Sequence, residues 1–277
     1  MTDAHCHPWN LKEYLDDPET ERRATGTAIV ASAWNLEQFE YHEGLAKKAM
    51  EDGAPQIFCC FALHPQLTGD DDFSLAEGPF MDGIELLQKL GSQGRLDAVG
   101  EAGFDLFNEE FRAGEKLQNE IFACHLETAL KYELPLVLHV RRAMHKIFPL
   151  TKELKKLPAV VFHSWPGTKA EGEALIKRGI NVFFSFGTTV LKNHRQAMAS
   201  AALLAPERIL LETDAPYQPL PSVPGQGKAF SSWRDLSAIC QQIAALRKKA
   251  GSPCSSKEEI EKITTENFFQ VFERGRV

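Results

Sequence analysis

The stretch LVLHVRRAMHKIFPLTKELKKLPAVVFH, residues 136–163, decides the fold. Its two ends, Leu136–Val140 and Ala159–His163, are short apolar runs of the kind found in strands buried on both faces. Between them, Met144–Leu157 mixes apolar and charged residues over a length typical of a helix. A strand, a helix and a second strand in this order predict one unit of a parallel sheet covered by helices.

The same alternation runs along the whole chain. The other candidate strands are Thr2–His7, Thr27–Ala33, Gln56–Leu63, Leu96–Glu101, Asn181–Phe186 and Ile209–Thr213. The other candidate helices are Leu36–Asp52, Phe80–Leu90, Phe111–Tyr132, Ala170–Arg178, Lys192–Leu204, Trp233–Lys249 and Lys257–Phe272. Strands and helices that alternate in this way over 277 residues predict an α/β fold, a (β/α)8 TIM barrel, formed by a single domain over residues 1–277.

The charge and the cysteines limit the classes of function. A net charge of −7 disfavours a broad basic surface for nucleic acid. It is more consistent with a narrow site that accepts a strand end than with a surface that wraps a duplex. Six cysteines without a CxxC pair indicate reduced thiols. No signal peptide is recognisable, and no apolar run approaches the length of a membrane span. We therefore expect a cytoplasmic protein without membrane contact.

Two longer loops follow candidate strands, so we expect both on the catalytic face of the barrel. One is the acidic segment that contains Asp70, Asp71 and Asp72. The other, Pro216–Gly227, is rich in proline and glycine and follows the last strand. We expect this second loop to close over the site.

Candidate metal ligands begin in the first strand. Asp3, His5 and His7 alternate there, and the period of two predicts that all three side chains share one face. Two histidines at this spacing can chelate one ion, although a lone His-x-His motif is weak evidence. Cys6 is predicted to point the opposite way, into the helix layer.

Other strands also end in residues of the ligand type. They are His64, Glu101, His139, His163 and Asp214. Because function in this fold collects at the carboxyl ends of the strands, the grouping of histidines and carboxylates predicts a metal site. The remaining histidines fall in helical or connecting segments, where surface or interhelical roles suffice: His42, His125, His145 and His194.

The ligand types fit two divalent cations. Imidazoles suit Zn, Mn, Fe, Ni or Co, and the carboxylates can bridge two cations or orient a water. Glu101 has two oxygens that can each serve one ion, and Asp214 can bind metal and accept a proton from the attacking water. The electrophile would be a phosphoryl or carbonyl centre.

Seven motifs resemble, in order, those of the TatD family of metal-dependent deoxyribonucleases, within the amidohydrolase superfamily. They are DAHCH (3–7), LHP (63–65), GEAGFD (100–105), LPLVLHVR (134–141), FHSWPG (162–167), LLETDAP (210–216) and ENFFQVF (266–272). Ala62, Trp165, the Pro8–Trp9 pair and the GEAGFD sequence depart from the usual family pattern, which puts substrate preference in doubt more than metal binding.

The resemblance implies a ligand set of two metals. One metal would be bound by His5, His7 and Asp214, the other by His139 and His163, and Glu101 would bridge them. The metal could be Zn, Mn, Mg, Ni, Co or Fe. The resemblance places His64 and Arg141 beside the metals, in contact with a substrate phosphate or a water, although a structural hydrogen bond or salt bridge would also explain either residue. Asn267 is expected to anchor the last helix.

The function implied by the resemblance is that of a metal-dependent hydrolase, a deoxyribonuclease of the 3′-5′ exonuclease type. Its substrate would be a DNA strand end or a small phosphodiester. Hydrolysis of a small amide, ester or lactone is an alternative, because fold does not settle chemistry. A metal-bearing adaptor without catalysis is a third possibility, and the complete ligand set argues against it. We expect a monomer or weak oligomer.

Overall fold

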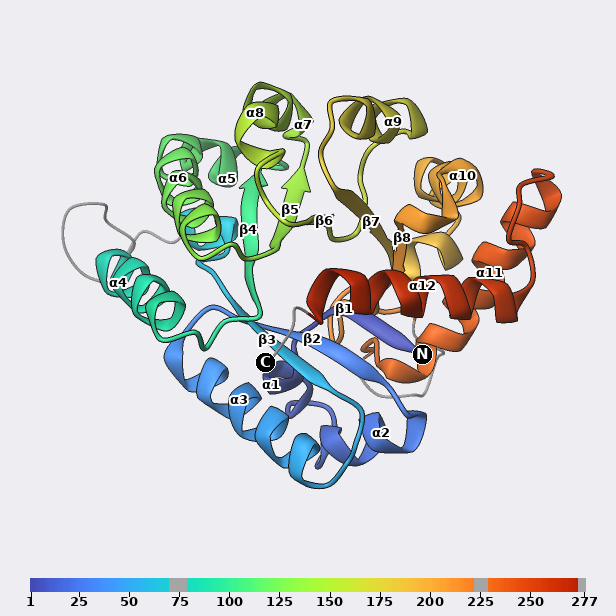
Figure 1. Ribbon diagram of the computed structural model, residues 1–277, viewed down its shortest axis with the longest axis horizontal. Coiled ribbons are helices and arrows are strands. Elements are labelled where there is room, and N and C mark those ends of the chain that lie inside the picture. The colour runs from blue at the N-terminus through green and yellow to red at the C-terminus, as the bar shows by residue number, and fades with distance from the viewer. Residues whose placement is uncertain (70–78, 222–228, 274–277) are drawn as a thin grey trace.

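The eight candidate strands form one parallel sheet in a computed structural model that describes residues 1–69, 79–221 and 229–273. The sheet has the order β1 to β8, and Figure 1 shows the helices around it. The strands are β1 Thr2–Cys6, β2 Ala28–Ala33, β3 Ile57–Phe61, β4 Ala98–Asp105, β5 Leu136–Arg141, β6 Val160–Phe162, β7 Val182–Phe186 and β8 Ile209–Leu211.

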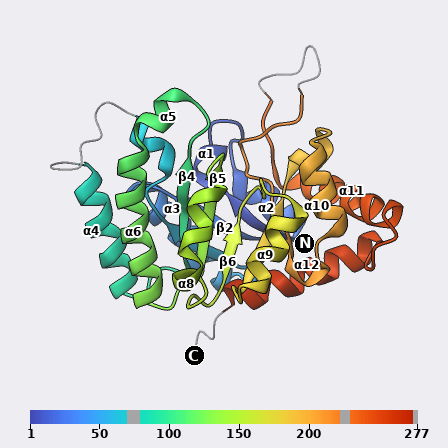
Figure 2. The ribbon, with the colours of Figure 1, turned by 90° about the horizontal axis from the view of Figure 1, so that it is seen from above.

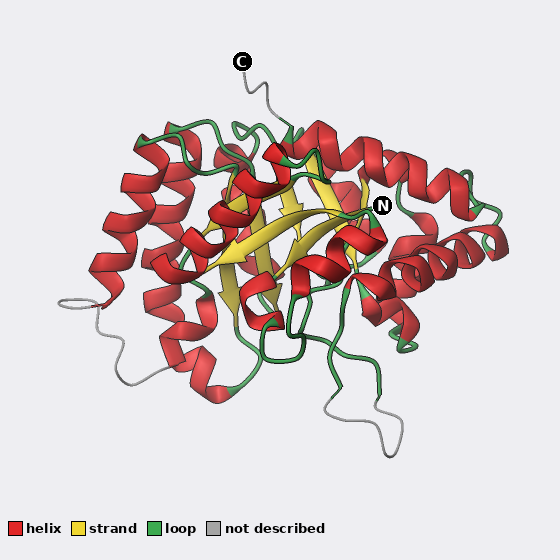
Figure 3. Cartoon of the chain, turned by 90° about the horizontal axis from the view of Figure 1, so that it is seen from below, coloured by secondary structure: helices red, strands yellow, loops and turns green. Residues whose placement is uncertain are grey.

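The helices enclose the strands, as the views in Figures 2 and 3 show. The α-helices are α1 Pro8–Leu11, α2 Pro18–Thr25, α3 Leu36–Glu51, α4 Pro79–Ser92, α5 Glu109–Ala113, α6 Glu115–Lys131, α7 Met144–Ile147, α8 Thr151–Leu154, α9 Lys169–Lys177, α10 Arg195–Leu203, α11 Leu236–Lys249 and α12 Lys257–Phe272. Short 3₁₀ helices cover Pro65–Gly69, Phe148–Leu150, Thr188–Leu191, Pro206–Arg208 and Trp233–Asp235. In the described ranges, we find no helix with the length and apolar character that crossing a membrane requires.

The first and last strands join to close the barrel. The backbone N–H of His7 donates to the carbonyl of Ala215 (2.7 Å), and that of Asp214 donates to the carbonyl of His5 (2.9 Å). Below these bonds, the Asp3 carboxylate accepts hydrogen bonds from the backbone N–H (3.0 Å) and the hydroxyl (2.6 Å) of Thr213. The prediction of a (β/α)8 barrel is confirmed.

Apolar side chains fill the interior of the barrel at the amino-terminal ends of the strands. The strand residues of this interior cluster are Ala4, Ala28, Val30, Phe58, Cys60, Ala98, Val137, Val161, Phe183 and Leu210. Helix α12 adds Phe268 and Phe272, whose rings lie 5.5 and 6.1 Å from the ring of Phe58. Asn267 of the same helix donates to the carbonyls of Pro206 and Ile209, so its expected anchoring contact is present. The carboxyl ends of the strands remain open for polar side chains.

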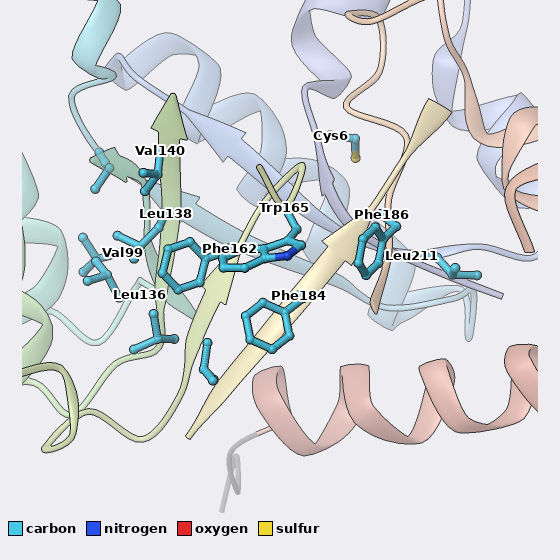
Figure 4. Close-up of a cluster of buried hydrophobic side chains, with 14 of the residues drawn as sticks. Cys6, Val99, Leu136, Leu138, Val140, Phe162, Trp165, Phe184, Phe186 and Leu211 are labelled. Atoms are coloured by element: carbon cyan, nitrogen blue, oxygen red, sulfur yellow. The ribbon is translucent and has the colours of Figure 1, made fainter. Parts of the chain in front are cut away.

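The opposite face of each strand packs against the helices. Figure 4 shows part of this outer cluster, with Leu136, Leu138 and Val140 of β5 pointing to the same side. The Trp165 ring lies between the rings of Phe162 (5.0 Å) and Phe184 (4.5 Å). Trp165 is therefore part of the core, with only 2% of its surface exposed.

Two predicted helices are interrupted, and two helices were not predicted. The predicted helix Phe111–Tyr132 divides into α5 and α6 at Gly114. The predicted helix Met144–Leu157 divides into α7, a 3₁₀ turn and α8, because Pro149 lacks a backbone N–H and its ring clashes with the preceding turn. Helices α1 and α2 occupy the connection from β1 to β2, where the sequence pattern predicted no helix.

Two predicted features fall wholly or partly outside the described residues. The acidic segment Asp70–Asp72 lies outside them, and so do residues 222–227 of the loop expected to close over the site.

Candidate metal centre

A bulge in β1 brings His5 to the inside of the barrel. Asp3 pairs with Ile29 and Cys6 with Ala31, so three steps along β1 match two along β2. Ala4 therefore joins the interior cluster and Cys6 the outer cluster, as expected for Cys6, while His5 faces the open end. The prediction that Asp3 shares a face with the histidines is wrong, because the period of two does not hold across the bulge.

A second bulge positions Glu101. Val99 pairs with Leu136 and Ala102 with Leu138, so β4 also has one extra residue beside Glu101. Directly after it, Gly103 has a φ of 144°, and a Cβ there would lie 2.0 Å from the carbonyl oxygen of His139. Only glycine allows β4 and β5 to approach this closely beside the Glu101 side chain.

One oxygen of Glu101 faces the ligands from the first and last strands. Its Oε2 lies 3.0 Å from Nε2 of His5 and 3.5 Å from Nε2 of His7. Asp214 completes this group, with its Oδ1 at 3.7 Å from His5 and 3.5 Å from His7. We call His5, His7 and Asp214 the Oε2 half of the site.

The other oxygen of Glu101 faces three histidines from three strands. Its Oε1 lies 2.7 Å from Nδ1 of His139 and 3.1 Å from Nε2 of His163. Nε2 of His64 also lies 3.1 Å from this oxygen. We call His64, His139 and His163 the Oε1 half of the site.

Three groups of these donor atoms could hold a metal ion. Within each group the atoms lie within 4.8 Å of one another, and the groups are His5–His7–Asp214, His5–Glu101–His163 and His64–Glu101–His139. Imidazoles and carboxylates that converge in a buried site match the donor set of divalent transition metals. The structure thus brings together all six predicted ligands: His5, His7, Glu101, His139, His163 and Asp214.

Both carboxylates of the site favour the charged state. Burial alone would raise the pKa of Glu101, but His64, His163 and His5 outweigh it and hold that pKa well below its ordinary value. The pKa of Asp214 is likewise lowered, because its hydrogen bond to His7 and the nearby histidines outweigh burial. Ionised carboxylates are the form that binds a cation.

Two acidic residues that were not among the predicted site residues lie beside the second ring nitrogens of His139 and His163. Asp105 accepts from Gln66 (2.8 Å) through the same Oδ2 that lies 3.1 Å from Nε2 of His139. Glu212 accepts from the backbone N–H of Ser164 (2.7 Å) and lies 3.4 Å from Nδ1 of His163, an ion-pair distance longer than a good hydrogen bond.

A neutral group holds the Oε2 half in the same way, since the Ser32 hydroxyl lies 3.1 Å from Nδ1 of His5. Such contacts orient metal-binding imidazoles. Asp105 and Glu212 are acidic residues at the ends of β4 and β8, within the GEAGFD and LLETDAP motifs, and that position is the signal that could have identified them.

His64 and Arg141 both face a cavity of about 1300 Å³ above the site. His64 has 16% of its side chain exposed and Arg141 has 46%. The Arg141 guanidinium lies 3.5 Å from the centre of the Phe107 ring, and its Nη1 lies 3.9 Å from Asp105. The Arg141 side chain is therefore open to a ligand in the cavity.

The other four histidines divide into two pairs. His42 and His125 are buried helix residues that accept the backbone N–H groups of Trp9 and Leu63, and burial lowers the pKa of each to about 3. His145 and His194 are exposed and line the cavity wall.

Comparison with known proteins identifies the family. The family model of the TatD related DNase matches residues 2–273. A "3′-5′ ssDNA/RNA exonuclease TatD" of Escherichia fergusonii is 32% identical over 204 residues, which are 73% of this chain and 73% of the relative. An "uncharacterized metal-dependent hydrolase" of Mycoplasma pneumoniae is 29% identical over 252 residues, covering 88% of this chain and 90% of the relative.

Solved structures show the same fold. The TatD homologue YJJV of Escherichia coli K12 has a TM-score of 0.80 at 24% identity and covers 99% of this chain and 98% of its own. A TatD family hydrolase of Entamoeba histolytica has a TM-score of 0.75 at 16% identity and covers 98% and 97%. With the family model matching nearly the whole chain, this protein belongs to the TatD-related DNase family and is a metal-dependent hydrolase, as predicted.

Proposed function

We propose that this protein removes nucleotides from the 3′ end of single-stranded DNA or RNA with the help of two divalent cations. The observation that carries the proposal is the division of ligands by Glu101, whose two oxygens face separate groups of histidines. The printed activity of the Escherichia fergusonii relative supports the choice of substrate.

The residues present fit two cations. His5, His7 and Asp214 would hold one, His139 and His163 the other, and Glu101 would bridge them. When bound, such a pair lowers the pKa of a water and neutralises charge on a phosphoryl group. The convergence of buried imidazoles on two ionised carboxylates supports this assignment, since Oε2 of Glu101 faces His5 and His7 while Oε1 faces His139 and His163.

Asp214 is the proposed proton acceptor. Its Oδ2 accepts a hydrogen bond from the Gln218 side-chain amide (2.8 Å), and its Oδ1 faces His5 and His7. One oxygen of Asp214 therefore faces the proposed metal ligands, and the other is oriented by Gln218. A carboxylate in this position can take the proton of the attacking water.

His64 and Arg141 are the proposed contacts to the scissile phosphate. His64 lies beside Glu101 at the floor of the cavity and keeps part of its ring exposed. Arg141 presents a planar guanidinium that matches two phosphate oxygens, and the Phe107 ring beneath it limits its freedom.

The test is release of nucleotides from end-labelled single-stranded DNA, duplex DNA and RNA, with Mg, Mn or Zn added to metal-depleted protein. We expect stepwise release from the 3′ end of single strands. Glu101→Ala should abolish it, and Asp214→Asn should lower the rate by about 10²–10⁴-fold if Asp214 accepts the proton. Glu173→Gln is the matched control, because the Glu173 side chain on α9 is 44% exposed and pairs with Lys169.

Two outcomes would contradict the proposal. Wild-type protein that carries metal but leaves every nucleic acid intact would redirect the search to small amides, esters and lactones. A stable protein partner together with no turnover on any of these substrates would favour an adaptor.

A further inference from the structure

Two aromatic side chains flank His7 at the floor of the cavity. Strands β2 and β8 are the neighbours of β1. Trp34 follows β2 directly, and Tyr217 lies a few residues after the end of β8. The ring centres of Trp34 and Tyr217 lie 5.7 and 5.1 Å from that of His7. Both residues line the cavity, and Tyr217 is 43% exposed. We call Trp34 and Tyr217 the aromatic wall.

Hydrogen bonds fix the backbone under both rings. The N–H of Trp34 donates to the side chain of Gln38 (3.1 Å), and the N–H of Tyr217 donates to the carbonyl of Asp214 (2.7 Å). The two rings are thus attached to anchored backbone. They differ in this way from Trp165, which is buried among core rings and cannot present a face to a ligand.

The opposite side of the cavity carries positive charge. It is formed after β4 and β5, where Arg141 and Arg142 lie over the Phe107 ring at 3.5 and 4.5 Å from its centre. Arg142 also donates to the carbonyl of Phe107 (3.1 Å), so its guanidinium is held at the rim. Arg141 and Arg142 form what we call the arginine wall; Glu110 also lines this cavity.

We infer that the cavity binds the 3′-terminal nucleotide with its base against the aromatic wall, while the phosphates of the nucleotides on its 5′ side lie along the arginine wall. This inference rests on the proposed function and gives the strand a direction across the site. The scissile phosphate would then lie over Glu101, between the walls. Stacking on aromatic rings accepts every base, since each base has a π face, whereas arginines contact phosphates without reading sequence.

The first experiment compares oligonucleotides of one length whose 3′-terminal nucleotide is either normal or abasic. We expect wild-type protein to prefer the normal end in kcat/KM by roughly tenfold. Trp34→Ala and Tyr217→Ala should reduce this preference, and Trp34→Phe should keep most of it because a ring remains. Arg142→Gln should raise KM for long strands more than for a dinucleotide.

The second experiment measures binding without turnover. Calorimetry of the metal-loaded protein compares deoxyadenosine monophosphate with deoxyribose 5-phosphate, which lacks the base. The nucleotide should bind more tightly than the sugar phosphate, and Trp34→Ala should remove this difference. That result supports the aromatic wall even if no strand is cleaved, in which case only the proposed function fails. Equal binding of the two ligands, or a preference for the base that both alanine variants retain, would overturn the inference whatever the turnover.

Discussion

The two halves of the metal centre are built in different ways. In the Oε2 half, a single short segment of β1 supplies His5 and His7, and Asp214 arrives through the bonds that close the barrel. In the Oε1 half, three separate strand ends supply one histidine each: His64, His139 and His163. The pair His5 and His7 has its spacing fixed by the local geometry of one strand. The proposed ligands His139 and His163 come from two strands, so their spacing depends on the barrel as a whole.

The supports behind the two halves also differ. The Oε1 half rests on the buried carboxylates Asp105 and Glu212, while His5 in the Oε2 half has the neutral hydroxyl of Ser32. A carboxylate that accepts from an imidazole raises the basicity of that ligand more than a hydroxyl does. The Oε1 half should therefore be more sensitive to changes outside its ligands.

The largest expected effect is that of Glu101→Ala, because Glu101 contacts both halves. The variant should lose metal from both of them, and activity with it, whereas His5→Ala should empty the Oε2 half and leave about one equivalent in the Oε1 half. Metal content after gel filtration measures this. Equal losses in the two variants would show that the halves do not bind independently.

A smaller effect is expected for Asp105→Asn. The amide keeps the size of the side chain but removes the charge that faces His139, so metal affinity of the Oε1 half should fall by about 10–100-fold. Competition with a chelator of known affinity gives the value. Asp82→Asn on the exposed face of α4 is the control, and an unchanged affinity in Asp105→Asn would refute the supporting role.

Ser32→Ala should change metal affinity less, by roughly 2–10-fold, because it removes one neutral hydrogen bond to His5. The same chelator competition measures it. The comparison between the halves fails if Ser32→Ala costs as much affinity as Asp105→Asn.

The stability of the protein in acid should depend on a histidine outside the metal centre. His125 holds the Leu63 N–H just before His64, and burial lowers its pKa to about 3 from an ordinary 6.5. The folded protein therefore keeps His125 neutral, so its contribution is complete above pH 6.5 and is lost as the pH falls below that value, by about 2 kcal/mol at pH 5. His125→Gln, which can still accept the N–H, should flatten the decline of Tm between pH 7 and 5. The control His145→Gln changes an exposed histidine and should leave the decline of Tm as in the wild type. An equally steep decline in both variants would exclude His125 as its cause.

The comparison of the halves also shows what the sequence could predict. The convergence of the candidate ligands could be predicted, because histidines and carboxylates at strand ends meet at one end of a barrel. The direction in which the Asp3 side chain points could not be predicted, because the bulges in β1 and β4 depend on pairing with neighbouring strands. Asp105 and Glu212 were missed because their role comes from contacts with histidines on other strands.

Local signals would have revealed helix α2. Asp17 accepts the N–H of Glu19 at its start, Pro18 occupies the first helical position, and Gly26 ends the helix with a left-handed φ of 63°. Such a capping residue, an initial proline and a final glycine are readable in the sequence. The break between α5 and α6 is harder to predict, because the reason for glycine at position 114 is tertiary: a Cβ there would lie 2.5 Å from Oγ1 of Thr68.

The closure of the barrel has a consequence for biosynthesis. Asp3 and Thr213 are 210 residues apart in the chain, yet their hydrogen bonds tie together the strands that carry His5 and Asp214. While the ribosome is still making the middle of the chain, the first two histidines have no Asp214 to complete their group. A nascent or truncated chain that ends before β8 would carry an unfinished site and an unpaired edge of β1, so hydrolysis can begin only after nearly the whole chain has been synthesised and folded.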